Sequence, residues 1–465
     1  MIRLEIWLDR ELVGWLTHDG ATNQFQFEYT PGWKAGPRSF PISPQLPLER
    51  APDVTAERHS AQVRQFFENL LPEGEALDHA AQASGTSKAN LVGLIVALGR
   101  ETAGAVRIVS REGVSADRAN PDYEGDGLRL VTAEQLSERI RKRAEIPFSV
   151  WDGRVRLSIA GFQDKIAIYE KHGNWYLVDG PRLASTVIVK PAPSNPQMAS
   201  LPANEFMCMH LAQVAGIEAA PTRLVAVPEP VLFVSRFDRV ETDTGVRRLH
   251  VIDGCQALGL SVSMKYERAY GDGRDVQHIR DGTSYPKLFR LLDLSPQPAR
   301  ERLALLRWVI FQVLIGNTDA HGKNISFFSS VQGIRLAPAY DLVCIPALGS
   351  NQLSDTYAMA IGDAFRERDL SPFEWANFAR QCGLPLRMVS QRLGQLSLRV
   401  LDSMEDVVAE VIEGGVHPEV AKSIAERVSL TCTRQFDLSP DILKIRETDF
   451  DPGRLQQSQT TGTGK

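Results

Sequence analysis

The sequence predicts an α+β protein with a bilobal layout, in which a β-rich lobe precedes a mainly helical lobe. Three observations predict this layout. Residues 126–245 alternate between apolar and polar side chains, residues 246–446 contain long apolar helical stretches, and 465 residues are more than one core usually holds. We therefore predict an N-terminal subdomain at 1–110, a β-rich lobe at 126–245, a helical lobe at 246–446 and a disordered tail at 447–465.

The N-terminal subdomain begins with a hairpin pattern. RLEIWLDRELVGWL and FQFEY alternate in the manner of strands, and Asp9-Arg10 and Asp19-Gly20 are typical turn pairs. A helical stretch is expected from about Ser60 to Leu98. Residues 111–125 are polar and rich in turn residues, which predicts a linker.

The β-rich lobe shows strands separated by short turns, which is typical of an antiparallel sheet. In RVRLSI the apolar Val155, Leu157 and Ile159 alternate with polar residues, and DKIAIYE, NWYLVD, STVIVKP, TRLVAV and VLFVSRF continue the pattern. One helix, NEFMCMHLAQVAG, interrupts the strands, and Gly216 is expected to end it.

The helical lobe contains two helices with Ser-Pro start signals. SPQPARERLALLRWVIFQVLIG is expected to start at its Ser-Pro pair and end at Gly316, and SPFEWANFARQCG to end at Gly383. After the first of these helices, ISFF is expected to return to the core as a strand.

Composition excludes several function classes. A net charge of −5 argues against broad, sequence-independent binding of nucleic acid, and no apolar run is long enough to span a membrane. The five cysteines form no CxxC pair, and the histidines show no metal-binding spacing. The N-terminus is not that of a signal peptide, so we predict a cytoplasmic protein.

Polar residues concentrate in IGNTDAHGKNISFF, which follows the apolar helix. Asp319 and Asn324 are five residues apart, the spacing that protein kinases use for a catalytic Asp and a Mg²⁺-binding Asn. Asp341 follows in APAYDLV and would supply the second oxygen ligand that Mg²⁺ needs. We assign His321 and Lys323 structural or secondary roles.

Phosphoryl transfer from ATP also needs a cation and a cover over the phosphates. Lys190 ends an apolar strand, and Glu205, on a mostly small and apolar helix face, is its candidate partner. The cover would be the stretch SIAGFQDK, whose backbone N–H groups can bind an anion. It comprises Ser158, Ile159, Ala160, Gly161, Phe162, Gln163, Asp164 and Lys165.

Each of these residues also has an ordinary structural interpretation. An isolated Asp-His-Asn loop usually serves helix capping, a lysine that ends a strand is usually solvated, and Glu205 could complement a helix dipole. The order of the groups favours the kinase interpretation: loop, lysine, glutamate, Asp-x₄-Asn and Asp follow one another as a kinase requires.

The chain resembles the HipA-type serine/threonine kinases, the toxins of bacterial toxin–antitoxin pairs, over about residues 2–440. The resemblance rests on SIAGFQDK, STVIVKP, ANEFMCMHLAQVAGI, FVSRFDR, CQALGL with KYE, IGNTDAHGKNISFF and LAPAYDL, together with FFENLLPEG and GRETAGAVRI near the N-terminus. It implies a protein-kinase/lipid-kinase-like fold, ATP and Mg²⁺ as cofactors, and phosphorylation of a Ser or Thr hydroxyl on a protein.

The resemblance also implies residue roles. Asp319 corresponds to the catalytic residue, Asn324 and Asp341 to the Mg²⁺ ligands, and Lys190 to the ATP lysine, while Ser158 corresponds to a serine that is autophosphorylated to inactivate the kinase. FVSRFDR corresponds to the hinge that meets adenine through backbone groups near Ser235 and Phe237, with Ser235 replacing an acidic residue. Ile252 and Gly254 also depart from the family pattern, in which Glu and Phe are common.

Three functions remain open from the sequence. The first is an active toxin kinase acting on a translation-related protein, such as an aminoacyl-tRNA synthetase. The second is a corepressor that reaches operator DNA through a small dimeric HipB-like antitoxin, since the chain has no convincing helix-turn-helix of its own. The third is a small-molecule or lipid kinase, although no basic amphipathic helix for a membrane surface is present. Phosphate transfer without the partner separates the first two.

Overall fold

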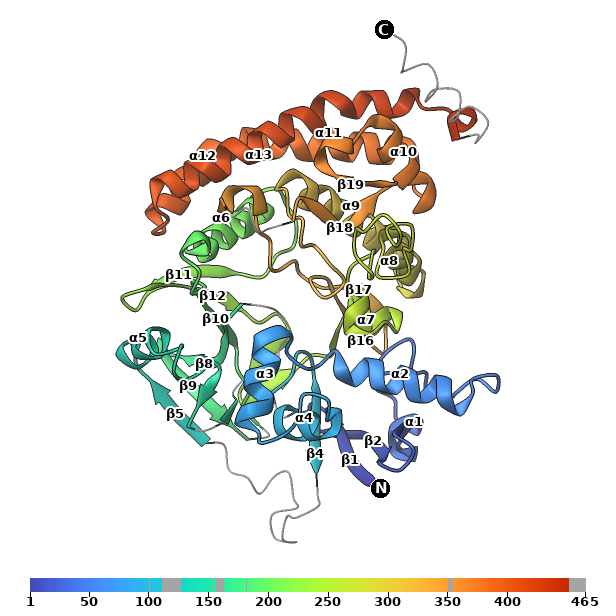
Figure 1. Ribbon diagram of the computed structural model, residues 1–465, viewed down its shortest axis with the longest axis vertical. Coiled ribbons are helices and arrows are strands. Elements are labelled where there is room, and N and C mark those ends of the chain that lie inside the picture. The colour runs from blue at the N-terminus through green and yellow to red at the C-terminus, as the bar shows by residue number, and fades with distance from the viewer. Residues whose placement is uncertain are drawn as a thin grey trace.

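The computed structural model describes residues 1–99, 101–110, 127–152, 154–155, 163–180, 182–349 and 354–450, and it combines helices and sheets as the sequence predicts (Figure 1). The predicted linker at 111–125 lies outside the described residues. Residues 447–450, assigned to the tail from sequence, form a 3₁₀ turn whose Phe450 ring lies 5.0 Å from that of Phe373. The rest of the predicted tail, 451–465, lies outside the described residues.

The N-terminal region forms an antiparallel sheet in the order β3-β2-β1-β4, with helices packed beside it. The predicted hairpin is confirmed, and Asp9 adopts the left-handed conformation at its turn (φ 52°). The elements are β1 (Ile2–Leu8), β2 (Glu11–Asp19), β3 (Gln24–Tyr29), α1 (Pro31–Ala35), α2 (Ala56–Glu68), α3 (Gly74–Ala83), α4 (Leu91–Leu98) and β4 (Val106–Ser110).

The second region contains the predicted antiparallel sheet, which has six strands in the order β11-β12-β10-β8-β9-β5. The elements are β5 (Gly127–Val131), α5 (Ala133–Arg141), β6 (Val150–Trp151), β7 (Arg154–Val155), β8 (Ile166–Lys171), β9 (Asn174–Asp179), β10 (Val187–Pro191), α6 (Leu201–Val214), β11 (Thr222–Ala226), β12 (Pro230–Ser235), β13 (Arg239–Thr242) and β14 (Gly245–Arg248).

Helix α6 ends as predicted at Gly216, which takes the left-handed conformation (φ 75°). The Gly216 N–H donates to Gln213 O at 2.9 Å and the Ile217 N–H to Ala212 O at 2.8 Å, so the last carbonyls of the helix have partners. This helix lies between the six-stranded sheet and helices α12 and α13 (Figure 1).

The third region is mostly helical but also contains a three-stranded sheet in the order β15-β16-β17. ISFF enters strand β16, as predicted. The elements are β15 (Val251–Asp253), α7 (Gly254–Leu258), α8 (Tyr285–Leu291), α9 (Pro298–Leu314), β16 (Ser326–Ser330), β17 (Gly333–Leu336), β18 (Thr356–Ile361), β19 (Ala364–Arg366), α10 (Pro372–Gln381), α11 (Leu386–Asp402), α12 (Met404–Glu413) and α13 (Pro418–Leu438).

The start of α9 differs from the prediction. The helix begins at Pro298 rather than at the Ser-Pro pair 295–296, because Ser295 Oγ accepts from the Gln297 N–H at 3.1 Å and closes a turn before the helix. The Ser371 start of α10 is as predicted, since Ser371 Oγ accepts from the Glu374 N–H at 3.3 Å.

Two large apolar cores hold these regions. One runs without a break from the N-terminal sheet through α6 and α9 to α13, and the other lies between the six-stranded sheet and α5. The last two turns of α9 are buried, with Leu314 at 0% and Ile315 at 1% exposure, so the residues that follow the helix start from the core. No helix in the described ranges is long and apolar enough to cross a membrane.

Candidate active site

Three charged side chains from distant parts of the chain meet in one cluster. Strand β10 carries Lys190, helix α6 carries Glu205, and Asp341 follows strand β17. Lys190 Nζ donates to Glu205 Oε1 at 2.7 Å and also contacts Asp341 Oδ1. The contact expected between Lys190 and Glu205 is therefore present, and the second carboxylate lies against the same ammonium.

Burial and neighbouring charges perturb this cluster. Burial would raise the pKa of Asp341, but the positive charges of Lys190 and Lys165 outweigh it and lower the pKa. Burial and the charge of Asp341 raise the pKa of Glu205, although Lys190 opposes them. Burial together with the charge of Lys190 lowers the pKa of Lys165 to about 8, despite Asp341. Two buried cations thus flank the Asp341 carboxylate, an arrangement suited to binding phosphate oxygens.

The polar loop, residues 316–325, starts where α9 ends. Gly316 turns the chain in the left-handed conformation (φ 66°). Asn317 is buried and makes three contacts: Nδ2 donates to Gln312 Oε1 at 2.8 Å and to Asp341 O at 3.2 Å, and Oδ1 accepts from the Asp319 N–H at 3.2 Å. A single amide thereby fixes both Asp319 and Asp341. Asp341 itself holds a left-handed φ of 52°, a conformation that costs free energy for most residues.

Asp319 lies exposed near Asp341, and its carboxylate has one defined neighbour. Tyr266 Oη donates to Asp319 Oδ1 at 2.8 Å. The surrounding protein excludes enough water to raise the pKa of Asp319, and the charge of Asp341 adds to this, whereas the Tyr266 hydrogen bond and the charge of Lys265 act in the opposite direction. Asn324 Nδ2 donates to Asp319 O at 2.8 Å, which leaves the amide oxygen of Asn324 as its atom for a cation.

Lys323 connects the polar loop to two other parts of the molecule. Its Nζ donates to Asn69 O at 2.9 Å, to Asn69 Oδ1 at 3.0 Å and to Asp253 Oδ2 at 2.7 Å. His321 is buried as well, accepts from the Lys323 N–H at 3.3 Å, and packs its ring edge-on against Tyr266 at 5.2 Å. Both residues hold the loop in place by these contacts, in line with the secondary roles predicted for them.

The predicted phosphate loop is described only at its end. Ser158, Ile159, Ala160, Gly161 and Phe162 lie outside the described residues. Gln163 Nε2 donates to Pro191 O at 2.9 Å, which joins the end of the loop to the residue after Lys190. Burial raises the pKa of Asp164, and Lys165 is buried at 8% exposure.

The segment expected to meet adenine lies at the end of β12. The Ser235 N–H donates to Pro221 O and the Arg236 N–H to Thr186 O, each at 2.8 Å, so these two amides are engaged within the fold. An adenine contact at this turn would come from other backbone groups near Phe237. The Phe237 ring lies 6.0 Å from Phe328 and 5.8 Å from Tyr340, the neighbour of Asp341.

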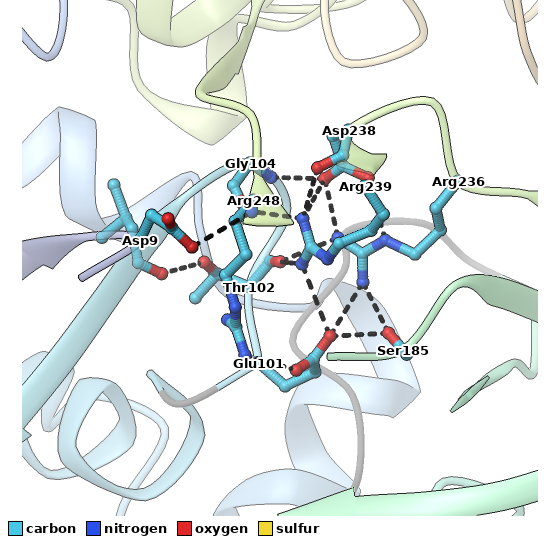
Figure 2. Close-up of polar contacts among 10 residues, drawn as sticks. Asp9, Glu101, Thr102, Gly104, Ser185, Arg236, Asp238, Arg239 and Arg248 are labelled. Atoms are coloured by element: carbon cyan, nitrogen blue, oxygen red, sulfur yellow. Dashed lines mark hydrogen bonds and ion pairs between the residues drawn. The ribbon is translucent and has the colours of Figure 1, made fainter. Parts of the chain in front are cut away.

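A buried ion network anchors this segment to the N-terminal region (Figure 2). Arg236 forms two hydrogen bonds with Asp238, of 2.9 and 2.7 Å, and a third with Glu101 Oε1 at 3.1 Å. Asp238 Oδ2 also accepts from the Gly104 N–H at 2.7 Å, and Arg239 Nη2 donates to Thr102 O at 3.0 Å. The segment and residues 101–104 are therefore held as one unit.

The donor set fits Mg²⁺ and a polyphosphate. Asp341 and the Asn324 amide would supply hard oxygens, the ligands that Mg²⁺ prefers when it shares its coordination with phosphates and water. Within the described residues there is no group of three or more His, Cys, Asp or Glu side chains that could hold a metal ion. Lys190 and Lys165 are two buried cations beside this set, and their charge is of the sign that phosphate oxygens need.

Sequence reasoning missed several contributors to the site. Asn317 was visible in the polar cluster without a role, and Tyr266 lies in the KYE stretch noted only for its resemblance. Glu73 and Asn69 of FFENLLPEG reach the site through Lys265 and Lys323, with Lys265 Nζ at 2.7 Å from Glu73 Oε2. A local sequence pattern does not show such contacts, because the bonded residues lie about 190 to 254 positions apart in the chain.

Comparison with known proteins gives consistent matches along the chain. Residues 4–109 match the family described as HipA N-terminal domain, and residues 157–408 match the HipA-like C-terminal domain. A serine/threonine-protein kinase toxin HipA of Shewanella oneidensis is 36% identical over 410 residues, covering 88% of this chain and 89% of the relative. A putative kinase of Sinorhizobium fredii is 33% identical, covering 88% of this chain and 92% of the relative.

A solved structure is similar over almost the whole chain. It is the Shewanella oneidensis HipA in a complex with HipB and its operator DNA, with a TM-score of 0.81 and 33% sequence identity. The match covers 95% of this chain and 100% of that one.

Proposed function

Because the chain belongs to the HipA family and is a serine/threonine kinase of that type, we propose that it uses ATP and Mg²⁺ to phosphorylate a Ser or Thr hydroxyl on a protein, as the toxin of a toxin–antitoxin pair. The observation that carries the proposal is the convergence of Lys190, Glu205 and Asp341 beside Asp319, with Asn317 bonded to both aspartates' backbones. A bilobal, protein-kinase-like arrangement of the lobes is part of the same proposal.

Positioning and charge do most of the work in phosphoryl transfer. Asp319 would orient the acceptor hydroxyl and take its proton, and its raised pKa brings it closer to that task than an ordinary carboxylate. Lys190, oriented by Glu205, would bind the phosphate oxygens, and Lys165 would add a second positive charge. Asn324 and Asp341 would hold Mg²⁺, which when bound neutralises charge on the phosphates.

The test is the Asp319→Ala variant. Transfer of radiolabelled phosphate from ATP to protein should fall by at least about 10²-fold, the usual contribution of a positioned base, while ATP affinity measured by calorimetry should stay nearly the same. Asp402→Ala, an exposed aspartate at the end of α11, is the matched control and should keep full activity. Transfer by Asp319→Ala at the wild-type rate would refute the assignment.

We also propose that the kinase inactivates itself by phosphorylating Ser158. A phosphate adds about −1.5 to −2 charges to a loop expected to bind the nucleotide's own phosphates, so repulsion would block ATP. Ser158→Ala should remain active after long incubation with ATP, whereas the wild type should lose activity. Mass spectrometry that finds phosphate elsewhere and never on Ser158 would contradict this.

The partner we propose is a HipB-like, dimeric DNA-binding antitoxin. The Shewanella oneidensis relative has been solved with HipB and operator DNA, and the net charge of −5 suits contact with DNA mainly through such a partner. The protein substrate that we propose is translation-related, for instance an aminoacyl-tRNA synthetase. If the purified chain transfers phosphate to protein without the antitoxin, its role is more than that of a corepressor.

A further inference from the structure

A cavity of about 590 Å³ lies next to the polar loop and plays no part in the function proposed above. Gly316 and Thr318 form one wall, and Ile345 and Pro346 of the segment after Asp341 form a second. The remaining lining residues come from strands β18 and β19, from helix α13, and from the residues that flank the two strands, among them Asp355 and Arg368. Residues on both sides of the proposed transfer site, one before Asp319 and a few after Asp341, therefore line one hollow.

The cavity is positively charged in a chain whose net charge is negative. Four arginines line it, against two carboxylates: Arg366, Arg368, Arg427 and Arg434 face Asp355 and Glu367.

Both carboxylates already have partners. Glu367 contacts the Arg427 guanidinium and accepts from Thr431 Oγ1 at 3.2 Å, and Asp355 lies 3.5 Å from Arg366. Positive charge at Arg368 and Arg434 is therefore left uncompensated within the cavity.

The two remaining arginines lie at the cavity's exposed rim. Arg434 Nη2 donates to Arg368 O at 3.3 Å, and no ion pair is found for Arg434 among the described residues. Arg368 has only a loose contact of 3.9 Å with Asp369, and both side chains are more than half exposed. Exposed ion pairs of this kind contribute little free energy, so Arg368 remains available to another anion.

Two buried polar atoms in the wall have no hydrogen-bond partner among the residues that the structure describes. They are Tyr357 Oη, on a residue only 6% exposed, and Arg427 Nε. A buried donor without an acceptor costs free energy, and most such groups in native proteins find a partner. Both atoms can donate, and both belong to side chains that line the cavity. An oxygen anion entering the cavity would provide the missing acceptor.

The cavity wall is also hydrogen-bonded to Thr318, the residue that precedes Asp319. The Ala358 N–H donates to Thr318 O at 2.9 Å, and Thr318 Oγ1 donates to Ser354 O at 2.9 Å. Strand β18, which carries Tyr357, is thereby bonded to the residue just before Asp319. Thr318, which lines the cavity, is the neighbour of Asp319 in the chain, so an occupant of the cavity would lie beside the segment that carries Asp319.

We propose that this cavity docks an acidic side chain of the protein substrate, near in sequence to the Ser or Thr that receives the phosphate. The inference rests on the kinase function proposed above and specifies which substrates it selects. An acidic protein segment fits the cavity better than nucleic acid. The positive charge is confined to a few arginines rather than spread along a backbone-length track, and Leu430, 63% exposed, adds an apolar surface that suits a neighbouring side chain. Electrostatic complementarity of this kind mainly sets specificity.

A binding experiment tests the docking independently of catalysis. Two fluorescein-labelled short peptides share a central serine, and one carries Asp and Glu around it where the other carries Asn and Gln. Fluorescence anisotropy without ATP should show that the wild type binds the acidic peptide at least about fivefold more tightly. The double variant Arg368→Glu, Arg434→Glu should lose that preference.

A charge-matched control separates docking from net charge. Arg58→Glu with Arg387→Glu makes the same charge change at two exposed positions that do not line the cavity, and it should keep the preference. The inference is overturned if the wild type does not distinguish the peptides, if the rim variant still prefers the acidic one, or if the control loses the preference equally. It is also overturned if a labelled single-stranded RNA binds more tightly than the acidic peptide and if, of the two double variants, only Arg368→Glu, Arg434→Glu loses the RNA binding.

Phosphate transfer to the same peptides distinguishes the two proposals. If Asp319→Ala transfers phosphate as fast as the wild type, the proposed function fails whatever the binding result. If transfer depends on Asp319 but is equal for both peptides, the kinase proposal stands and the docking inference fails.

Discussion

Replacing Glu101 with glutamine would remove the charge that three arginines share in the buried network of Figure 2. Glu101 accepts from Ser185 Oγ at 2.6 Å, from Arg236 at 3.1 Å, from Arg239 at 3.4 Å and from Arg248 at 3.0 Å. The arginine side chains are almost fully buried, at 1–3% exposure. Glutamine keeps the shape but leaves these guanidinium groups with less negative charge than they need, which is costly in a buried site.

The size of the effect follows from the proton affinity of Glu101. Burial alone would raise its pKa, but the charges of Arg248, Arg239 and Arg236 outweigh burial and lower the pKa from 4.5 to about 2. A tenfold change in proton affinity corresponds to about 1.4 kcal/mol, so the carboxylate contributes about 3 kcal/mol to folding at pH 7. Because the folded-state pKa is the lower one, this contribution is present above about pH 4.5 and is lost as the pH falls toward 2.

The assay is urea unfolding followed by tryptophan fluorescence, at pH 7 and at several lower pH values. With a slope on the order of 3 kcal/mol/M, Glu101→Gln should lower the urea midpoint at pH 7 by about 1 M. It should also reduce the loss of stability below pH 4.5, since the titrating group is gone. Glu426→Gln, on the exposed side of α13, is the control and should change neither quantity. A midpoint for Glu101→Gln equal to that of the control would refute the reasoning.

Two further predictions concern the polar loop. Tyr266→Phe removes a hydrogen bond that lowers the pKa of Asp319, so that pKa should rise further and the acid limb of the pH–rate profile should move to higher pH. An unshifted profile would mean that the phenol does not act on Asp319. Lys323→Met leaves Asp253 and the carbonyl of Asn69 without the buried ammonium that they share. The free energy of unfolding, measured with urea, should fall by about 3 kcal/mol. The kcat of phosphate transfer should fall as well, because Lys323 holds the polar loop. A free energy of unfolding equal to that of the wild type would show that the contacts of Lys323 with Asn69 and Asp253 do not stabilise the fold.

Much of the fold could be predicted because its signals are local. The alternation around Leu177 and Val189 predicts strands, and Gly216 and Ser371 mark helix ends through their own backbone and side-chain chemistry. The predicted start of α9 was wrong because a Ser-Pro pair is equally compatible with a helix start and with a turn before the helix. The hydrogen bond from the Gln297 N–H to Ser295 shows that this pair forms the turn.

The sequence by itself determined which residues make up the candidate site and what chemistry we propose for them. Asp319, Asn324, Asp341, Lys190 and Glu205 are recognisable from residue type, spacing and order, because phosphoryl transfer requires those groups and the first two lie on one short loop.

Only the tertiary structure decided how these groups are held and charged. Asn317 is bonded to the backbones of both aspartates, Lys323 reaches back to Asn69, and Lys165 joins Lys190 beside Asp341. The cavity beside Thr318 likewise combines β18, β19 and α13. The physical reason is that burial and charge pairing depend on distances between residues far apart in the chain, and a local sequence pattern does not contain those distances.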